Sequence, residues 1–366
     1  MFGLAYARQI SEQERRHEEH FFIHDYLGGG GVNDTAVHSN DQRTNGSASY
    51  NHCNDRDVAP AGGNYLPSSF FNVRLNASHQ VAFDAAVGPP FTTGVFVGDG
   101  KTTTAVALGT PTFGSVSDPF IPPNGDVVFD ANFSNTFRSD GKTIVPLVQE
   151  GDPAPGGGTV ISTQRVVNDH SVIAYGAIIN DSTATQGIFR TDGTESVAIA
   201  RDDVSPPTGG TFLLLDNLSI NERGQVSFFS AMTGGSADFG VFRGEGGELT
   251  PIFLSNQPAP GGASFNDFGN PVINRHGQVA SAASLTNGAS HEGIFVGDGT
   301  NAIAIALEGQ PAPKGGVYSD PRGRLTVRLP IKLNDRGDFL SIPLWQTVRV
   351  PPASFSEMES KRKLSR

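Results

Sequence analysis

Residues 274–316 read NRHGQVASAASLTNGASHEGIFVGDGTNAIAIALEGQPAPKGG, and this stretch contains three markers that decide the fold. The first is an Asn-x-x-Gly turn entering an apolar run, the second is Gly-Ile-Phe followed by Asp-Gly, and the third is Pro-Ala-Pro with two glycines behind it. An Asp-Gly pair between apolar runs predicts a tight hairpin with Asp and Gly as its central residues. Proline and glycine interrupt strands, so the third marker predicts a connector between strands.

The same markers recur in the same order along the chain. The asparagine turn begins at Asn76, Asn168, Asn221, Asn274 and Asn334, with a degenerate copy at Pro122, giving spacings of 46, 46, 53, 53 and 60 residues. Each period contains four apolar runs, which in the fourth copy are residues 211–219, 225–232, 240–244 and 248–254. Four short strands per repeat of this size are typical of β-propeller blades.

Composition supports this interpretation, because 45 Gly and 24 Pro among 366 residues argue against long helices. We predict an all-β, β-propeller-like array of about 50-residue, four-stranded antiparallel blades, five complete and a partial sixth, over residues 57–345. Residues 1–56 lack the markers. Ser11 and Glu14 predict a short helix near 12–27, and the polar stretch 33–54 predicts disorder. Residues 346–366 are predicted to be a basic C-terminal tail.

Charge and motifs exclude several classes of function. The chain has 37 acidic and 26 basic residues, and its net charge of −11 argues against a nucleic-acid partner. Cys53 is the only cysteine, which excludes an intrachain disulfide and a cysteine-based zinc site within one chain. No signal-peptide pattern, membrane-spanning apolar run, nucleophile elbow, phosphate loop or dinucleotide fingerprint is found, and no cofactor is implied.

Two sets of side chains could hold a metal ion. His17, His20 and His24 would share one face of the N-terminal helix, although a solvated helix face explains them more simply. Asp99, Asp140, Asp192 and Asp298 recur at the hairpin tips and could bind calcium, but aspartate also stabilises such turns by bonding its own backbone. The sequence leaves metal binding undecided.

The repeated asparagines and phenylalanines have two possible roles each. The asparagines at 76, 168, 221, 274 and 334 could line a ligand surface, whereas an asparagine that opens a turn more often satisfies backbone donors. The phenylalanines at 96, 137, 189, 242 and 295 are expected to pack between blades rather than to stack on a base or sugar. A glycosidase-like pair of carboxylates facing a central channel stays open, although the sequence does not identify its two members.

The combination N-x-x-G-x-V-A-F, G-I-F-x-x-D-G and P-A-P-G-G resembles bacterial tandem-repeat proteins that are typically exported and carry varied C-terminal anchors. The resemblance covers roughly residues 57–345 and implies an extracellular or cell-surface location more than a reaction. We therefore predict a non-catalytic repeat scaffold or binding module with a protein or carbohydrate ligand. The alternative is a propeller-type polysaccharide hydrolase or lyase. The oligomeric state is not predicted.

Overall fold

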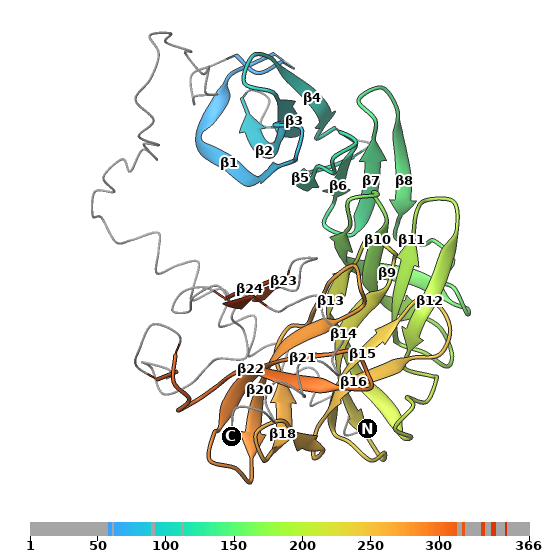
Figure 1. The fold of residues 1–366 in the computed structure, drawn as a ribbon. Coiled ribbons are helices and arrows are strands. Elements are labelled where there is room, and N and C mark those ends of the chain that lie inside the picture. The colour runs from blue at the N-terminus through green and yellow to red at the C-terminus, as the bar shows by residue number, and fades with distance from the viewer. Residues whose placement is uncertain are drawn as a thin grey trace, which may run out of the picture. The chain divides into compact units, whose positions relative to one another are not determined.

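Each repeat folds into its own antiparallel sheet, and the sheets follow one another in chain order in this computed structural model (Figure 1). The structure describes residues 58–312 apart from 61, 89–91 and 111–112, together with 317–318, 331–333, 338–341 and 348–349. These residues form strands and turns, and none of them is helical. The predicted all-β, propeller-like array is confirmed. The helix predicted near 12–27 lies outside the described residues.

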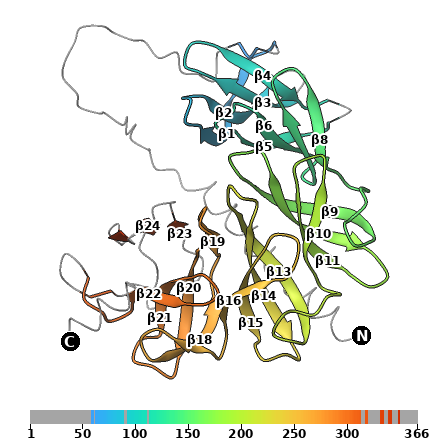
Figure 2. The same cartoon turned by 45° about the vertical axis from the view of Figure 1, so that its right-hand side comes forward.

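The first four repeats each form a four-stranded sheet whose spatial order follows the chain. The first sheet consists of β1 (Tyr65–Leu75), β2 (Val81–Val87), β3 (Thr92–Gly98) and β4 (Thr103–Leu108). The second consists of β5 (Val116–Phe120), β6 (Val127–Ala131), β7 (Asn135–Ser139) and β8 (Ile144–Val148). The third consists of β9 (Thr159–Val167), β10 (Ile173–Asn180), β11 (Gln186–Thr191) and β12 (Ser196–Arg201). The fourth, whose order can be followed in Figure 2, consists of β13 (Thr211–Ile220), β14 (Val226–Thr233), β15 (Phe239–Gly244) and β16 (Thr250–Leu254).

The last two sheets depart from this plan. The fifth consists of β17 (Pro258–Ala259), β18 (Ala263–Phe268), β19 (Val272–Ile273), β20 (Val279–Thr286), β21 (Glu292–Gly297) and β22 (Ala302–Leu307). The sixth consists of β23 (Ile331–Leu333), β24 (Asp338–Ser341) and β25 (Val348–Arg349). Strand β25 belongs to the segment predicted as a tail, yet it pairs with β24. The last sheet therefore extends past residue 345, where the repeat domain was predicted to end.

Alternating side chains of the third strand join the third sheet to both of its neighbours. In β11, Ile188 packs in a buried cluster with the fourth repeat, including Phe212 and Phe242. The next residue, Phe189, packs in a different cluster with Val128 and Leu147 of the second repeat. Successive side chains of a strand point to opposite faces, so one apolar run supplies two interfaces. This explains why these strands are apolar along most of their length.

The glycine of the Gly-x-Phe marker leaves room for the phenylalanine ring. Residues i and i+2 of a strand share a face, and a Cβ atom added to Gly187 would lie 2.5 Å from Cζ of Phe189. The repeated phenylalanines are buried in all five repeats, as predicted. In the first, second and fourth repeats their rings stack across the sheet on a phenylalanine of the second strand, as Phe96 does on Phe83 at a centroid distance of 5.5 Å, whereas Phe295 of the fifth repeat lies opposite Ser281.

The Pro-Ala-Pro connector lies between strands, as predicted, but it also folds back on itself. In the third repeat Ala154 N donates a hydrogen bond to Gly158 O at 3.0 Å, and Pro153 forms a bridge with Thr159 at the start of β9. The alanine that precedes a proline of the connector is buried at Ala59, Ala154 and Ala259. The connector is therefore a small hairpin, which precedes the first strand of the first and third sheets and forms β17 and the start of β18 in the fifth.

One buried hydroxyl makes an unfavourable contribution. Ser227 in β14 is fully buried, and its Oγ atom has no hydrogen-bond partner among the described residues. The equivalent residues in the first, third and fifth repeats are Ala82, Ala174 and Ala280. Each directly precedes the residue of the second strand that lies opposite the repeated phenylalanine.

We expect Ser227→Ala to raise the free energy of unfolding by about 1 kcal/mol, because the buried hydroxyl loses its hydrogen bonds to water on folding and gains none in the protein. Chemical denaturation would measure the change. The control is Ser281→Ala, which removes a hydroxyl that donates to Gly269 O at 3.0 Å and should be destabilising. A loss of stability in both variants would contradict the prediction.

Candidate functional site

The repeated asparagines are structural residues. Asn221 Oδ1 accepts hydrogen bonds from the backbone N–H groups of Arg223 and Gln225 at 3.0 and 2.9 Å, and its Nδ2 donates to Asn274 O in the next repeat at 2.9 Å. Asn168 makes the same donation to Asn221 O, and Asn76 makes it to Pro122 O. These side chains are buried, so they do not line a ligand surface. Asn334 lies outside the described residues.

The aspartates at the hairpin tips stabilise their own turns. Asp192 Oδ1 accepts hydrogen bonds from Thr194 N at 2.7 Å and Glu195 N at 3.0 Å, and the hydrogen bond from the Thr194 hydroxyl together with these lowers the pKa of Asp192 to about 2. Asp99, Asp140 and Asp298 accept the same backbone bonds. The described residues contain no group of three or more His, Cys, Asp or Glu side chains arranged to hold a metal ion.

The hairpins are displaced by one residue from the predicted turn. Among the central residues only glycine has a positive φ, which is 91° at Gly193 and 96° at Gly299, whereas the aspartates do not have one. Positive φ at the first central position alone is the pattern of a type II′ turn. The central pair is therefore Gly-Thr rather than Asp-Gly, because the aspartate carboxylate bonds the two N–H groups that follow the glycine.

The histidines 17, 20 and 24 lie outside the described residues, so the predicted metal site there is not addressed by the structure. No helix in the described part of the chain has the length and apolar character needed to cross a membrane.

Several strand residues that differ from their equivalents in other repeats carry charged side chains, and these side chains form two networks.

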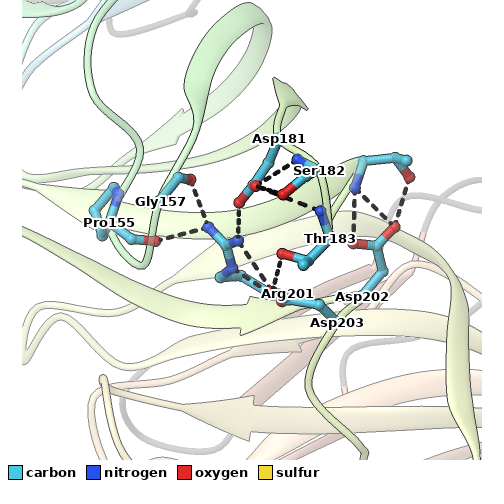
Figure 3. A network of polar contacts seen from close by, with 9 residues as sticks. Pro155, Gly157, Asp181, Ser182, Thr183, Arg201, Asp202 and Asp203 are labelled. Carbon is cyan, nitrogen blue, oxygen red and sulfur yellow. Dashed lines mark hydrogen bonds and ion pairs between the residues drawn. The ribbon is translucent and has the colours of Figure 1, made fainter.

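The first network surrounds Arg201, which occupies the position held by Leu108, Leu254 and Leu307 in other repeats. Its guanidinium group donates to Pro155 O, Gly157 O, Asp181 and Asp203, at distances between 2.8 and 3.1 Å (Figure 3). Hydrogen bonds from Arg201 lower the pKa of both aspartates. All five N–H donors of the arginine are used, so the network fixes the connector and offers no free donor to a ligand.

The second network involves equivalent aspartates in the first two repeats. Asp84 in β2 and Asp130 in β6 each follow the phenylalanine that pairs with the repeated Phe of the third strand. Each lies two residues from a side chain that packs against the next repeat, which is Ala82 for Asp84 and Val128 for Asp130. Since residues i and i+2 share a face, both carboxyl groups face the next repeat.

Asp130 has a partner that compensates its charge. Arg165 Nε of β9 lies 2.6 Å from Asp130 Oδ1, and Thr136 Oγ1 donates to the same oxygen at 2.8 Å. Arg165 Nη2 also donates to Asp118 O at 2.6 Å. Burial raises the pKa of Asp130, while the charge of Arg165 and its hydrogen bond act in the opposite direction. This ion pair joins the second and third repeats.

Asp84 lacks such a partner. Its residue surface is 7% exposed, its Oδ1 atom has no hydrogen-bond partner among the described residues, and no described basic side chain forms an ion pair with it. Burial raises the pKa of Asp84, a hydrogen bond from Asn72 lowers it, and the charge of Asp118 raises it. A buried carboxyl group without a compensating charge costs stability, which makes it a candidate for function.

The residues around Asp84 are exposed or strained. Phe71 of β1 lies opposite Asp84 in the strand register, and 55% of its surface is exposed. Asp118 has Arg74 at 3.8 Å. Asn72 and Asp118 have φ values of 48° and 49°, in the left-handed region that residues other than glycine seldom occupy. We call Asp84 together with Phe71, Asn72, Arg74 and Asp118 the Asp84 site.

The sequence contained a weak signal for this site. The triplet Phe-Asp-Ala occurs at residues 83–85 and again at 129–131, at equivalent places in two repeats. The triplets alone do not reveal that one aspartate has an arginine partner and the other has none. That difference depends on Arg165, which is separated from Asp130 by 35 residues.

The model of a family of unknown function (DUF7453) matches residues 132–340. The comparison with curated proteins found no match. Among solved structures, a chain of a nidogen/laminin complex is similar at 11% identity and a TM-score of 0.36, covering 66% of this chain and 81% of that one.

Two further structures are similar to this chain. A protein of unknown function from Dyadobacter fermentans has 14% identity and a TM-score of 0.34, covering 68% of this chain and 86% of that one. An ulvan lyase, a polysaccharide lyase, has 10% identity and a TM-score of 0.36, covering 75% of this chain and 78% of that one. At these TM-scores the likenesses carry no argument about chemistry.

Proposed function

The chain belongs to the family of unknown function DUF7453, and we propose that it is a non-catalytic, cell-surface or secreted repeat scaffold that binds a carbohydrate at the Asp84 site. The observation that carries the proposal is the Oδ1 atom of Asp84, which is buried without a partner where the equivalent Asp130 has one. This atom is closed to solvent, so a ligand hydroxyl group that displaces the cover over it would supply the missing hydrogen bond.

The neighbouring side chains favour a sugar over other hydroxylated ligands. An exposed aromatic ring such as Phe71 offers a flat apolar face to the C–H groups of a pyranose. Arg74 and Asp118 are about half exposed and can bond further hydroxyl groups with their free donors and acceptors. The other repeated or buried polar side chains, namely the turn asparagines and Arg201, make their hydrogen bonds within the protein.

The proposal is tested by binding of the purified full chain to a panel of neutral and acidic polysaccharides. We expect Asp84→Ala to weaken binding by roughly 10- to 100-fold, the range for a hydrogen bond that involves an ionisable group. Phe71→Ala should also weaken it, whereas Phe133→Ala, which removes an exposed ring from the turn after β6, should not. Unchanged affinity in the Asp84 and Phe71 variants would refute the assignment.

One observation favours the alternative, a polysaccharide hydrolase or lyase. Asp84 has a raised pKa and lies close enough to Asp118 for their charges to interact. Two carboxyl groups in unlike environments are the arrangement that glycosidases use for a general acid and its partner. Incubation of the bound polysaccharide with the protein distinguishes the two functions. New chain ends that form with the natural chain but not with Asp84→Asn would establish catalysis. A polymer of unchanged length would support binding without catalysis.

A further inference from the structure

A cavity of about 180 Å³ lies at the junction of the third and fourth repeats, apart from the Asp84 site. It is bounded by the turn that follows β9, by the hairpin between β11 and β12, and by the turn that follows β13. Its charged lining residues are His170, Arg190, Asp192, Glu195, Glu222 and Arg223.

The sequence of the third repeat is unusual where the cavity lies. In the first, fourth and fifth repeats a glutamine follows four residues after the turn asparagine and accepts its Nδ2 hydrogen bond at 2.9 Å, as Gln80, Gln225 and Gln278 do. Gln225 also donates to Glu245 of the hairpin in its own repeat. The third repeat has Val172 at this position, and Val172 lines the cavity. Valine is shorter and has no amide, so the third repeat lacks the hydrogen bond between the asparagine and the glutamine at the wall of the cavity.

The two turns that bound the cavity are held together by charged contacts. His170 Nδ1 lies 2.9 Å from Glu222 Oε2, which links the turn of the third repeat to that of the fourth. Arg190 Nη1 donates to Gly224 O at 2.8 Å. These contacts fix the walls of the cavity without filling it.

Side chains of both charges line the cavity. Within the described residues the side chains of Arg223 and Glu195 form no hydrogen bond or ion pair, and Asp192 is exposed. Arg190 and Arg223 supply positive charge, whereas Asp192 and Glu195 supply negative charge. A simple anion or a simple cation would therefore meet repulsion from one of the two pairs.

We propose that this cavity binds a small zwitterion of amino-acid size, with its carboxylate toward Arg190 and Arg223 and its ammonium group toward Asp192 and Glu195. The volume suits a small molecule rather than a polymer chain. Val172, which replaces the glutamine of the first, fourth and fifth repeats, lines the cavity, so this lining is particular to the third repeat.

The test is calorimetric titration of the full chain with glycine, L-alanine and L-glutamate, with acetate and methylammonium as singly charged probes. We expect the amino acids to bind and the singly charged probes to bind at least tenfold more weakly. Arg223→Gln and Glu195→Gln should each weaken binding of the amino acids by about tenfold. Glu248→Gln, which changes the residue equivalent to Glu195 in the fourth repeat, should leave binding unchanged.

Val172→Gln separates binding from folding, because it restores the residue that other repeats use. We expect this variant to retain or raise the thermal midpoint while losing amino-acid binding by at least tenfold. Three results would each overturn the proposal: no binding of any of the three amino acids at about 10 mM, a concentration well above a millimolar Kd, acetate or methylammonium binding as tightly as glycine, or undiminished binding by Val172→Gln.

Discussion

Replacement of Arg165 by alanine is expected to lower the free energy of unfolding by roughly 3–5 kcal/mol, the usual cost of breaking a buried ion pair. Only 5% of the Arg165 side chain is exposed, and its removal leaves the buried carboxylate of Asp130 without a compensating charge. The loss should shrink as the pH falls, because protonation of Asp130 removes the uncompensated charge. Chemical denaturation at several pH values measures both effects.

The junction between the second and third repeats makes this loss severe. Pro122 replaces the turn asparagine of the other repeats and has no side-chain donor. The hydrogen bond that an asparagine Nδ2 would donate to the backbone oxygen of residue 168 in the next repeat is therefore missing. Arg138 donates to Asp192 O, whereas its counterpart Arg190 donates to Gly224 O in the asparagine turn of the next repeat. Arg165 therefore adds a buried ion pair to a junction whose other polar contacts are hydrogen bonds, such as that from Thr163 Oγ1 to Ser134 O at 2.7 Å.

Arg74→Ala is the matched control for Arg165→Ala. Its side chain is 48% exposed and lies 3.8 Å from Asp118, so its loss should change the free energy of unfolding by less than about 1 kcal/mol. Similar losses from the two arginine variants would show that the Asp130 pair does not hold this junction together.

Gly299→Val is expected to destabilise the protein by roughly 2–4 kcal/mol, because it combines left-handed backbone strain with overpacking. The φ of Gly299 is 96°, and an added Cβ atom would lie 2.3 Å from Cγ2 of Thr250 in β16 of the preceding repeat. The hairpin tip thus lies against the fourth strand of its neighbour, as that of Gly193 lies against Leu147. Thermal or chemical denaturation measures the loss.

Gly141→Val isolates the strain from the overpacking. Gly141 occupies the same place in the second repeat with a φ of 82°, and an added Cβ atom would meet no atom within 4 Å. Gly141→Val should lower the free energy of unfolding by only about 1–2 kcal/mol, which is the contribution of the left-handed backbone strain alone. Equal costs at the two glycines would mean that the hairpin tip does not pack against the preceding repeat.

Much of the fold follows from local sequence. The Asn-x-x-Gly turns, the Gly-x-Phe strands and the proline connectors are short-range signals, and their order predicts antiparallel sheets of four strands. In the first five repeats the strand after the turn pairs with the strand of the repeated phenylalanine, as Tyr175 lies opposite Phe189. Strand β25 was missed because Val348–Arg349 carries none of the markers of a third strand.

The candidate site was less accessible to prediction because it depends on contacts between repeats. Asp84 and Asp130 look alike in sequence, and only the position of Arg165 in the third repeat distinguishes them. Arg201 was recognisable in principle, since it replaces leucine in an apolar strand position. Its carbonyl and carboxylate partners come from the connector and the loop after β10, which strand patterns do not bring together.

Under the proposed function, Asp84 is retained for binding at a cost to stability. Its folded pKa is raised above the ordinary value of 3.8, so the folded state holds the proton more tightly than the unfolded state. The contribution of Asp84 to stability must therefore decrease as the pH rises from 3.8 through the folded pKa, and it levels off above that.

Asp192 provides a control of opposite sign. Its folded pKa is lowered to about 2, so its contribution is present above the unfolded value of 3.8 and is lost as the pH falls toward 2. Asp192→Asn should accordingly be less stable than the natural chain at neutral pH, with a deficit that shrinks in acid.

The most direct test is the free energy of unfolding of the natural chain and of Asp84→Asn, measured by chemical denaturation from acid to neutral pH. We predict that Asp84→Asn gains stability relative to the natural chain as the pH rises above 3.8 and is the more stable protein at pH 7, while it binds carbohydrate more weakly. A variant that loses stability on the same rise in pH would show that the carboxylate of Asp84 is compensated in the folded protein, and would contradict the account.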